Sequence, residues 1–304
     1  MTLAIRMEDV KHRYPDGTIS LNGVDLSVKE GDAVAILGAN GSGKTTLLLH
    51  LNGTLHPSSG SVYIYGVKIT KKNVDYARKN VGIVFQESDD QLFMPTVHDD
   101  VAFGALNTKP KEEALEETEK LLKKLGLYQL RNKVPHFLSG GQKKLVALAG
   151  VLVMKPKILV MDEPTANLDF ETKNMIISII KNLEREHRLT LIFTSFDVQI
   201  IPVLAHKVAI MKKGKVVAYG ETRKILTDEE LLREAGIEPP PFVPLAKKMG
   251  FNKIPLTLEE AEEEFQKVGL LKNKYPNEKH TSNTQKLSKR RPSYKLLKEI
   301  EGAS

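Results

Sequence analysis

The segment GANGSGKT at residues 38–45 constrains the fold of this 304-residue chain more than any other stretch. It fits the pattern G-x-x-x-x-G-K-T of a phosphate-binding loop, which connects a buried strand to a helix. The apolar run AVAILG leads into it and TLLLHLN follows it, so the context predicts that strand and that helix. Glycines allow backbone N–H groups to converge on a phosphate at the positive end of the helix. The candidate nucleotide-binding residues are Gly38, Ala39, Asn40, Gly41, Ser42, Gly43, Lys44, Thr45 and Thr46.

A second motif, KILVMDEP at residues 157–164, is an apolar run that ends in two carboxylates. Such a pair at a strand end is common, but beside a phosphate-binding loop it has a mechanical meaning. Asp162 is expected to hold the shell of a Mg²⁺ ion, together with the Thr45 hydroxyl, and Glu163 to polarise the attacking water. Lys44 is expected to reach the β- and γ-phosphate oxygens. The two motifs together predict a site for a nucleoside triphosphate and Mg²⁺.

Apolar runs of strand length alternate with amphipathic helices along the chain. Residues 33–38, 157–164 and 189–195 are predicted strands, and residues 111–125 a helix that stops before Gly126. Near-continuous apolar strands that alternate with helices indicate an α/β fold with a covered, largely parallel sheet. Residues 207–219 predict a hairpin around Lys213-Gly214.

Composition excludes several classes of protein. The chain has no cysteine, so it has no disulfide framework, thiolate metal site or cysteine nucleophile. Its longest apolar run, at residues 145–154, is shorter than the roughly 20 residues that span a bilayer, and the N-terminus shows no secretory signal. We therefore expect a cytoplasmic location.

The net charge of +7 is concentrated in the tail, where residues 271–304 hold nine Lys or Arg against three Glu. The rest is nearly neutral, which argues against nucleic acid as a partner. The tail composition is typical of a disordered segment, with contact to an acidic partner or an anionic lipid surface as the alternative. Residues 1–221 are expected to form a nucleotide-binding domain. A small helical extension at residues 222–270 follows, with the Pro-rich EPPPFVP within it.

LSGGQ at residues 138–142 resembles the signature of the ATP-binding cassette (ABC) ATPases, and it lies between the two motifs as it does in that family. The resemblance implies the P-loop ABC-ATPase fold, with an N-terminal antiparallel β subdomain, a helical signature subdomain and a small C-terminal extension. It also implies that the chain binds ATP with Mg²⁺. It further implies a head-to-tail dimer with a second ABC ATPase subunit, in which the γ-phosphate of the ATP held by that subunit faces this segment. From the residues alone the segment is a helix start with Ser139 as N-cap, and the two roles are compatible. The signature residues are Ser139, Gly140, Gly141 and Gln142.

Three further positions match the family one by one, and the resemblance covers residues 3–220. Tyr14 stands where an aromatic residue stacks on adenine, with a buried strand tyrosine as the alternative. Gln86 resembles the Q-loop glutamine, which contacts Mg²⁺ or water, and Asp169 ends a segment that resembles the D-loop at the dimer interface. The implied catalytic residues are Glu163, Lys44 and Gln86, and the implied metal-binding residues are Thr45, Gln86 and Asp162.

One position departs from the family pattern. The family places a histidine after the strand that follows the D-loop helix, whereas this chain has Phe196 there, followed by Asp197. A phenylalanine ring cannot hydrogen-bond the γ-phosphate or the attacking water, so the transition state loses a donor. His187 and His206 do not follow that strand directly and are not expected to replace it. ATP binding is expected to persist, and the rate of hydrolysis stays open.

Residues 85–104 are similar to the Q-loop region of the energy-coupling factor (ECF) importers, and residues 51–60 and 254–265 also resemble this group, especially its cobalt and nickel branch. The resemblance implies a peripheral subunit on the cytoplasmic face of the membrane. Its partners are a transmembrane ECF coupling protein and a substrate-binding membrane subunit, and its extension helps dimerisation. The solute that the resemblance implies is a cobalt or nickel ion or a vitamin. Four apolar residues are expected either to line a docking groove for the coupling protein or to belong to the core. They are Leu92, Phe93, Met94 and Val97.

Two other functions compete with this interpretation. A soluble ABC ATPase of DNA repair or translation usually has a long inserted coiled coil or a second cassette, and neither is present in this sequence. A catalytically weak ATP-binding partner in a heterodimeric ATPase is the other alternative, and Phe196 is the residue that motivates it. Both homodimer and heterodimer stay open.

Overall fold

The protein is described by a computed structural model for residues 2–187 and 189–270, and the predicted tail from residue 271 lies outside the described residues. The chain divides into two compact units. Unit 1 comprises residues 1–91 and 154–261, and unit 2 comprises residues 92–153 and the chain from residue 262.

An antiparallel sheet in the N-terminal part of unit 1 has the strand order β2-β1-β4-β5. A turn at residues 14–18 joins β1 and β2, and the buried residues of these strands alternate with exposed ones. This sheet is the antiparallel β subdomain that the family resemblance implied. The strands are β1 (Leu3–Arg13), β2 (Ile19–Lys29), β4 (Ser59–Ile64) and β5 (Val67–Lys68).

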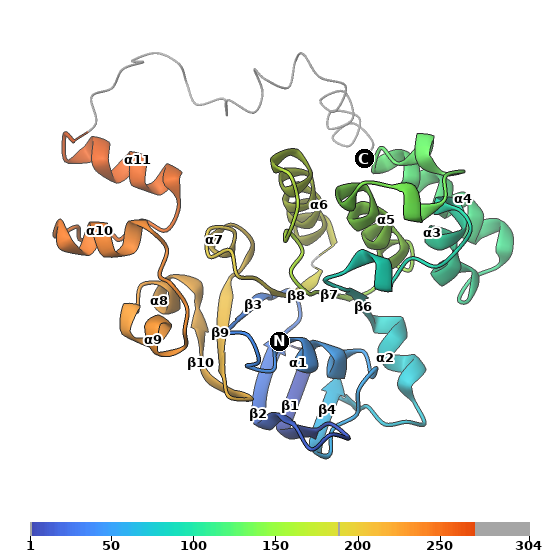
Figure 1. Ribbon diagram of the computed structural model, residues 1–304, viewed down its shortest axis with the longest axis horizontal. Helices are drawn as coiled ribbons and strands as arrows, with labels where there is room; N and C mark the ends of the chain where they lie inside the picture. The colour runs from blue at the N-terminus through green and yellow to red at the C-terminus, as the bar shows by residue number, and fades with distance from the viewer. Residues whose placement is uncertain (1, 188, 271–304) are drawn as a thin grey trace. The chain divides into compact units, whose positions relative to one another are not determined.

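The second sheet of unit 1 has the strand order β10-β9-β3-β8-β7-β6 (Figure 1). It is parallel except for the edge pair β10 and β9, which is antiparallel. Every residue of β3, β7 and β8 is buried, as expected for apolar strands of a covered sheet. The strands are β3 (Ala33–Leu37), β6 (Val81–Val84), β7 (Ile158–Met161), β8 (Thr190–Thr194), β9 (Lys207–Lys212) and β10 (Lys215–Glu221).

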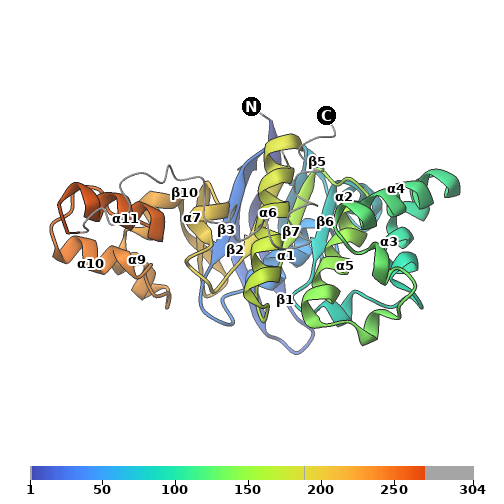
Figure 2. The same cartoon turned by 90° about the horizontal axis from the view of Figure 1, so that it is seen from above.

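Helices cover this sheet. Leu47, Leu48 and Leu51 of the helix after the phosphate loop share one core with both sheets. Helix α6 lies on one face of this sheet and buries Ile176 and Ile180 (Figures 1 and 2). The helices of this part are α1 (Lys44–Leu51), α2 (Val74–Asn80), η1 (Ser88–Asp90), α6 (Phe170–His187) and α7 (Ile201–Leu204).

The predicted hairpin turns at Lys213 and Gly214, whose φ angles of 49° and 74° suit a two-residue turn with a left-handed backbone. Its tip contacts the phosphate loop and strand β2. The Gly214 N–H donates to the Ser42 carbonyl at 3.0 Å, and the Gly214 carbonyl accepts from the Asn22 N–H at 2.8 Å. A Cβ at residue 214 would lie 2.6 Å from the Ser20 carbonyl oxygen, so only glycine fits.

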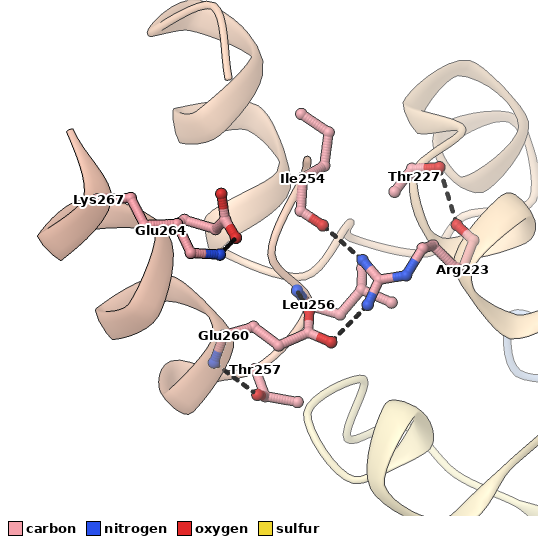
Figure 3. A network of polar contacts seen from close by, with 8 residues as sticks. All are labelled: Arg223, Thr227, Ile254, Leu256, Thr257, Glu260, Glu264 and Lys267. Atoms are coloured by element: carbon pink, nitrogen blue, oxygen red, sulfur yellow. Dashed lines mark hydrogen bonds and ion pairs between the residues drawn. The ribbon is translucent and has the colours of Figure 1, made fainter. Parts of the chain in front are cut away.

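Four helices follow β10, in the stretch expected to form the helical extension (Figure 1). They are α8 (Thr222–Leu226), α9 (Glu229–Glu234), α10 (Phe242–Lys248) and α11 (Leu258–Lys267). Arg223 of α8 connects to the start of α11 through an ion pair with Glu260 and a 2.7 Å hydrogen bond to the Ile254 carbonyl (Figure 3). Glu260 also accepts from the Leu256 N–H at 2.8 Å.

Unit 2 is mostly helical. Helix α3 packs against α4 and α5, and α4 confirms the helix predicted at residues 111–125. Val97 is fully buried and belongs to the core, whereas Phe93 is 65% exposed and contacts the edge of Phe103, with ring centroids 5.0 Å apart. The helices are α3 (Val97–Leu106), α4 (Lys111–Lys124), η2 (Tyr128–Leu130), η3 (Pro135–Phe137) and α5 (Gly140–Leu152). Throughout the described part of the chain, no helix combines the length and apolar character that a bilayer crossing requires.

Candidate functional site

The phosphate loop leaves β3 at Gly38 and enters α1 at Gly43, as predicted. Gly43 has a φ of 101°, and a Cβ there would lie 2.5 Å from the Ser20 carbonyl oxygen, so the helix can begin here only with glycine. No side chain caps this helix start. Its first N–H groups are therefore available to an anion, which the positive end of the helix also favours.

Lys44 is folded back onto the loop that precedes it. Its Nζ donates to the Gly38 carbonyl at 2.8 Å and to the Ala39 carbonyl at 3.1 Å, and the residue is only 8% exposed. Burial lowers the pKa of Lys44, while the nearby carboxylates of Glu163 and Asp162 oppose that shift. The amine therefore lies in the loop with two carbonyls as partners and has to turn to reach a phosphate.

Asp162 lies at the end of β7 and is gripped by two hydroxyl groups. Thr45 Oγ1 donates to Asp162 Oδ2 at 2.6 Å, and Thr194 Oγ1 donates to Asp162 Oδ1. Mg²⁺ prefers hard oxygen ligands and in triphosphate sites combines one or two protein oxygens with phosphate oxygens. The converging Thr45 hydroxyl and Asp162 carboxylate fit that requirement. Among the described residues no cluster of three or more His, Cys, Asp or Glu forms a complete metal cage.

Glu163 is 4% exposed and is held by its main chain and its side chain. Its N–H donates to Thr194 Oγ1 at 2.9 Å, and its Oε2 accepts from the Phe196 N–H at 3.1 Å. Its φ of 47° is unusual for a residue other than glycine and turns the chain sharply after β7. The carboxylate is thereby fixed beside Asp162 and within the electrostatic reach of Lys44.

Phe196 lies two residues after the end of β8 (Thr190–Thr194), at the position where the family resemblance placed a histidine. Its ring centroid lies 4.5 Å from Lys44 Nζ, so the substituting side chain points into the same site. The next residue, Asp197, forms an ion pair with Lys173 of α6. His206, which the sequence did not favour as a replacement, pairs with Glu184 at 2.9 Å and accepts weakly from the Ala33 N–H.

Tyr14 follows β1 and is half-buried. Its hydroxyl lies 3.0 Å from Thr46 Oγ1, which also accepts from Ser20 Oγ at 2.7 Å. The edge of His12 packs on the Tyr14 ring, with centroids 4.7 Å apart. The structure therefore brings Tyr14 to the phosphate loop, held by a hydrogen bond at one end and an aromatic contact along its ring.

Five more predicted positions of unit 1 are exposed. Gln86 follows β6, whose Val84 carbonyl accepts from the Asp162 N–H at 2.9 Å, so both side chains come from the carboxyl ends of neighbouring parallel strands. Asp169 immediately precedes α6 and accepts from the Thr172 N–H at 2.9 Å and the Thr172 hydroxyl at 2.8 Å, which lowers the pKa of Asp169. Ala39, Asn40 and Gly41 are also exposed.

The signature residues lie in unit 2, at the start of α5. Ser139 is the N-cap, as the sequence indicated, because its Oγ accepts from the Gln142 N–H at 3.3 Å. Gln142 returns the contact, since its Oε1 accepts from the Ser139 N–H at 3.2 Å. This reciprocal capping box leaves Ser139 and Gly140 exposed at the positive end of a 13-residue helix.

Sequence reasoning missed Thr194 and the histidines behind Tyr14. Thr194 is fully buried, and its single hydroxyl contacts both Asp162 and Glu163. The available signal was a polar residue at the carboxyl end of an apolar strand, because parallel strands bring such ends to one edge of the sheet. The edge-to-face pair of His12 and His50, with centroids 4.8 Å apart, had no signal in the spacing of the sequence.

Comparison with known proteins agrees with this geometry. The family model described as ABC transporter matches residues 21–166. The energy-coupling factor transporter ATP-binding protein EcfA of Methanothermobacter thermautotrophicus is 44% identical over 268 residues, which cover 86% of each chain. The protein of the same name from Methanocaldococcus jannaschii is 45% identical and covers 78% of this chain and 85% of its own length.

Two solved structures are similar throughout most of the chain. CbiO1 from Clostridium perfringens, part of the ABC transporter complex CbiONQ, is 38% identical with a TM-score of 0.68, over 81% of this chain and all of its own. A dimeric ATP-binding cassette in a post-hydrolysis state with ADP and phosphate is 28% identical with a TM-score of 0.66, over 72% of this chain and 99% of its own. With its phosphate loop, its acidic strand end and these relatives, the chain belongs to the ABC transporter ATPases, and within them to the energy-coupling factor type.

Proposed function

We propose that this chain binds and hydrolyses ATP on the cytoplasmic face of the cell membrane and thereby energises an ECF importer. The observation that carries the proposal is the meeting of Thr45, Asp162 and Glu163 beside the phosphate loop, through the hydrogen bonds of Thr45 and Thr194. A hydroxyl, a metal-binding carboxylate and a second carboxylate at one strand end are the groups that phosphoryl transfer to water requires.

The catalytic roles follow from this arrangement. Lys44 turns from its two loop carbonyls to the β- and γ-phosphate oxygens, which offer charge-assisted hydrogen bonds. Thr45 and Asp162, with Gln86 at the neighbouring strand end, hold Mg²⁺, which neutralises charge on the phosphate oxygens when it is bound. Glu163, fixed by the Phe196 N–H, orients the attacking water and accepts its proton.

Binding of the nucleotide uses the phosphate loop and the aromatic residue next to it. The backbone N–H groups of residues 38–46 surround the phosphates, and the adenine stacks on Tyr14, whose hydroxyl is tied to Thr46. Ser139, Gly140, Gly141 and Gln142 are proposed to face the γ-phosphate of a second ABC ATPase subunit, since a capped and exposed helix start is an anion site. Asp169 is proposed to lie at that dimer interface.

The membrane partners are proposed from the exposed apolar side chains of unit 2. Phe93 and Phe103 form an edge-to-face pair, and both are substantially exposed, which is typical of a surface covered by another protein. Leu92 and Met94 are half-buried beside Phe93 in the sequence. A transmembrane ECF coupling protein is proposed to dock here and to transmit movement to a substrate-binding membrane subunit.

The solute is proposed to be a cobalt or nickel ion, with a vitamin as the second candidate. The likeness to CbiO1 and the resemblance of residues 51–60, 85–104 and 254–265 to the cobalt and nickel branch support it. Uptake of radiolabelled cobalt, nickel and vitamins by membrane vesicles that contain the intact importer tests this assignment. Saturable, ATP-dependent uptake of a vitamin and of neither metal would contradict the metal.

The ATPase assignment is tested by steady-state Mg-ATP hydrolysis of the purified chain, with Lys44→Ala as the blank. Turnover above that blank supports a self-contained motor. ATP binding without turnover, restored only by a second ABC ATPase subunit of different sequence, would replace it by the catalytically weak partner of a heterodimer. Equal ATP binding by the wild type and Lys44→Ala would contradict the nucleotide site itself.

A further inference from the structure

The phenylalanine that departs from the family pattern contacts both candidate catalytic groups. Its ring faces the Lys44 ammonium at 4.5 Å, and its main-chain N–H donates to Glu163 Oε2 at 3.1 Å. Phe196 is nevertheless 56% exposed, so burial of apolar surface does not explain where its ring lies. The contact with a cation does, because the face of an aromatic ring attracts an ammonium group.

The loop that carries Phe196 is fixed on both sides. Before it, the Thr194 hydroxyl accepts from the Glu163 N–H at 2.9 Å. After it, the Asp197 N–H donates to Ser195 Oγ at 3.0 Å, and the Asp197 carboxylate pairs with Lys173. These contacts determine where the N–H and the ring of residue 196 point. None of them requires a titratable side chain at residue 196.

The ring and a triphosphate compete for the same amine. In this conformation Lys44 Nζ has the Gly38 and Ala39 carbonyls and the Phe196 ring as neighbours. Phosphate oxygens offer stronger, charge-assisted bonds, but they require the amine to leave these partners. The net free energy of binding to this amine is therefore the difference between the free energies of the two sets of contacts.

We propose that Phe196 is a positioning residue of the hydrolysis site, whose ring keeps Lys44 folded onto the phosphate loop until a triphosphate draws it out, and whose main-chain N–H orients Glu163. This proposal rests on the proposed ATPase function. The phenylalanine ring and its main-chain N–H thus restrain both Lys44 and Glu163, although this position has no imidazole.

The first test is ATP affinity measured by calorimetry. Phe196→Leu removes the ring and keeps the N–H, so ATP is expected to bind about two to five times more tightly, as the strength of an exposed cation–ring contact implies. Phe196→Tyr, which keeps a ring, is expected to retain the wild-type affinity. Tyr63→Leu is the matched control, because it removes the ring that Arg6 contacts at 4.1 Å on the N-terminal sheet. Unchanged or weaker binding in Phe196→Leu would overturn the proposal.

The second test is spectroscopic. The chain has no tryptophan, so Phe196→Trp introduces a single tryptophan at the site, whose emission can be excited at wavelengths that the eight tyrosines do not absorb. ATP is expected to shift its emission with the same saturation as binding, and AMP, which has no β- or γ-phosphate, is expected to leave it unchanged. Tyr63→Trp is the control and is expected to respond to neither nucleotide. Emission that stays constant while ATP binds would show that the ring does not move.

The third test separates the N–H from the ring. Phe196→Pro removes both, so kcat is expected to fall about tenfold relative to Phe196→Leu while the two variants bind ATP equally. Equal kcat in these variants would overturn the role of the N–H.

Unfolding curves identify a variant that fails to fold, and Phe196→Met then replaces Phe196→Leu. If the wild type binds no ATP, the proposed function fails and this proposal with it, whereas normal wild-type binding with an unaltered Leu variant overturns this proposal alone.

Discussion

At the scale of single residues, the site depends on one buried hydroxyl group. Thr194 Oγ1 donates to Asp162 and accepts from the Glu163 N–H, so the proposed metal-binding residue and the proposed base are held by the same atom. The side chain is completely buried at the end of β8. It thereby orders the two residues that carry the proposed catalytic carboxylates.

Thr194→Val is expected to lower both stability and turnover. The valine has nearly the same shape but leaves the buried Glu163 N–H without its acceptor, which costs about 1–3 kcal/mol of unfolding free energy. Urea unfolding measures that loss, and steady-state hydrolysis measures the accompanying fall in kcat. Thr194→Ser keeps the hydroxyl and is the control. If valine and serine variants hydrolyse ATP equally well, the hydroxyl does not position Glu163.

The residues that could be predicted were those with a fixed spacing in the sequence. The phosphate loop and the Asp162-Glu163 pair each lie within one short segment, so their chemistry is visible without a structure. The contacts of Thr194 and Phe196 join β8 to residues about thirty positions away. Such contacts depend on the order of strands in the sheet, which the sequence does not state.

At the scale of elements, α1 carries a buried histidine behind the candidate nucleotide site. His50 is 1% exposed, and its Nδ1 lies 2.7 Å from the Thr46 carbonyl, to which it donates. His12 and His56 are the titratable groups that act on it electrostatically, and burial is the largest effect. Burial lowers the pKa of His50 from 6.5 to about 4.

The free energy of unfolding is expected to fall as the pH decreases from about 6.5 to about 4. In that window the unfolded chain binds a proton at residue 50 and the folded chain does not, so acid favours unfolding by about 3 kcal/mol in total. Above pH 6.5 both states are neutral and the dependence disappears. Urea unfolding at a series of pH values measures the slope. His50→Gln, which can still donate to the Thr46 carbonyl, is expected to have a shallower slope, and an identical slope would contradict the assignment to His50.

The start of α5 allows its structural role to be separated from the proposed contact with a phosphate. Ser139→Ala removes the cap and is expected to cost about 1 kcal/mol, whereas Ser139→Asp keeps a capping oxygen and the stability. The aspartate adds a negative charge where the γ-phosphate is proposed to lie, so hydrolysis is expected to fall at least tenfold. Thermal unfolding and hydrolysis are compared for both variants. A loss of activity only in proportion to lost stability would make the segment purely structural.

The long elements were predictable and the short ones were not. Strands β3, β7 and β8 are apolar over their whole length, and α4 has a clear amphipathic period with acidic and basic ends. Helix α7 has four residues and α8 has five, which is less than two turns and too short for any period to emerge. Their existence depends on packing against neighbouring elements, α8 against β9 and β10 and α7 against α6 and α8.

At the scale of the whole molecule, ATP is expected to control association. Glu163→Gln keeps the shape of the proposed base but removes its capacity to accept a proton, so bound ATP should persist and hold two subunits together. Light scattering with Mg-ATP is expected to give twice the monomer mass for Glu163→Gln. The double variant with Lys44→Ala is expected to stay monomeric. A monomer at saturating ATP would contradict the head-to-tail dimer, and unaltered turnover would contradict Glu163 as the base.

The tip of the β9–β10 hairpin has a practical consequence for engineering. Surface hairpins are usually the most permissive places for an inserted tag or probe. Here, however, Gly214 bonds to the main chain of Ser42 and of Asn22 and has no room for a side chain. An insertion in this turn would displace the phosphate loop to which the turn is hydrogen-bonded. The length of the turn is therefore constrained. The open turn at Gly66, where a Cβ meets nothing within 4 Å, is the better place for a label.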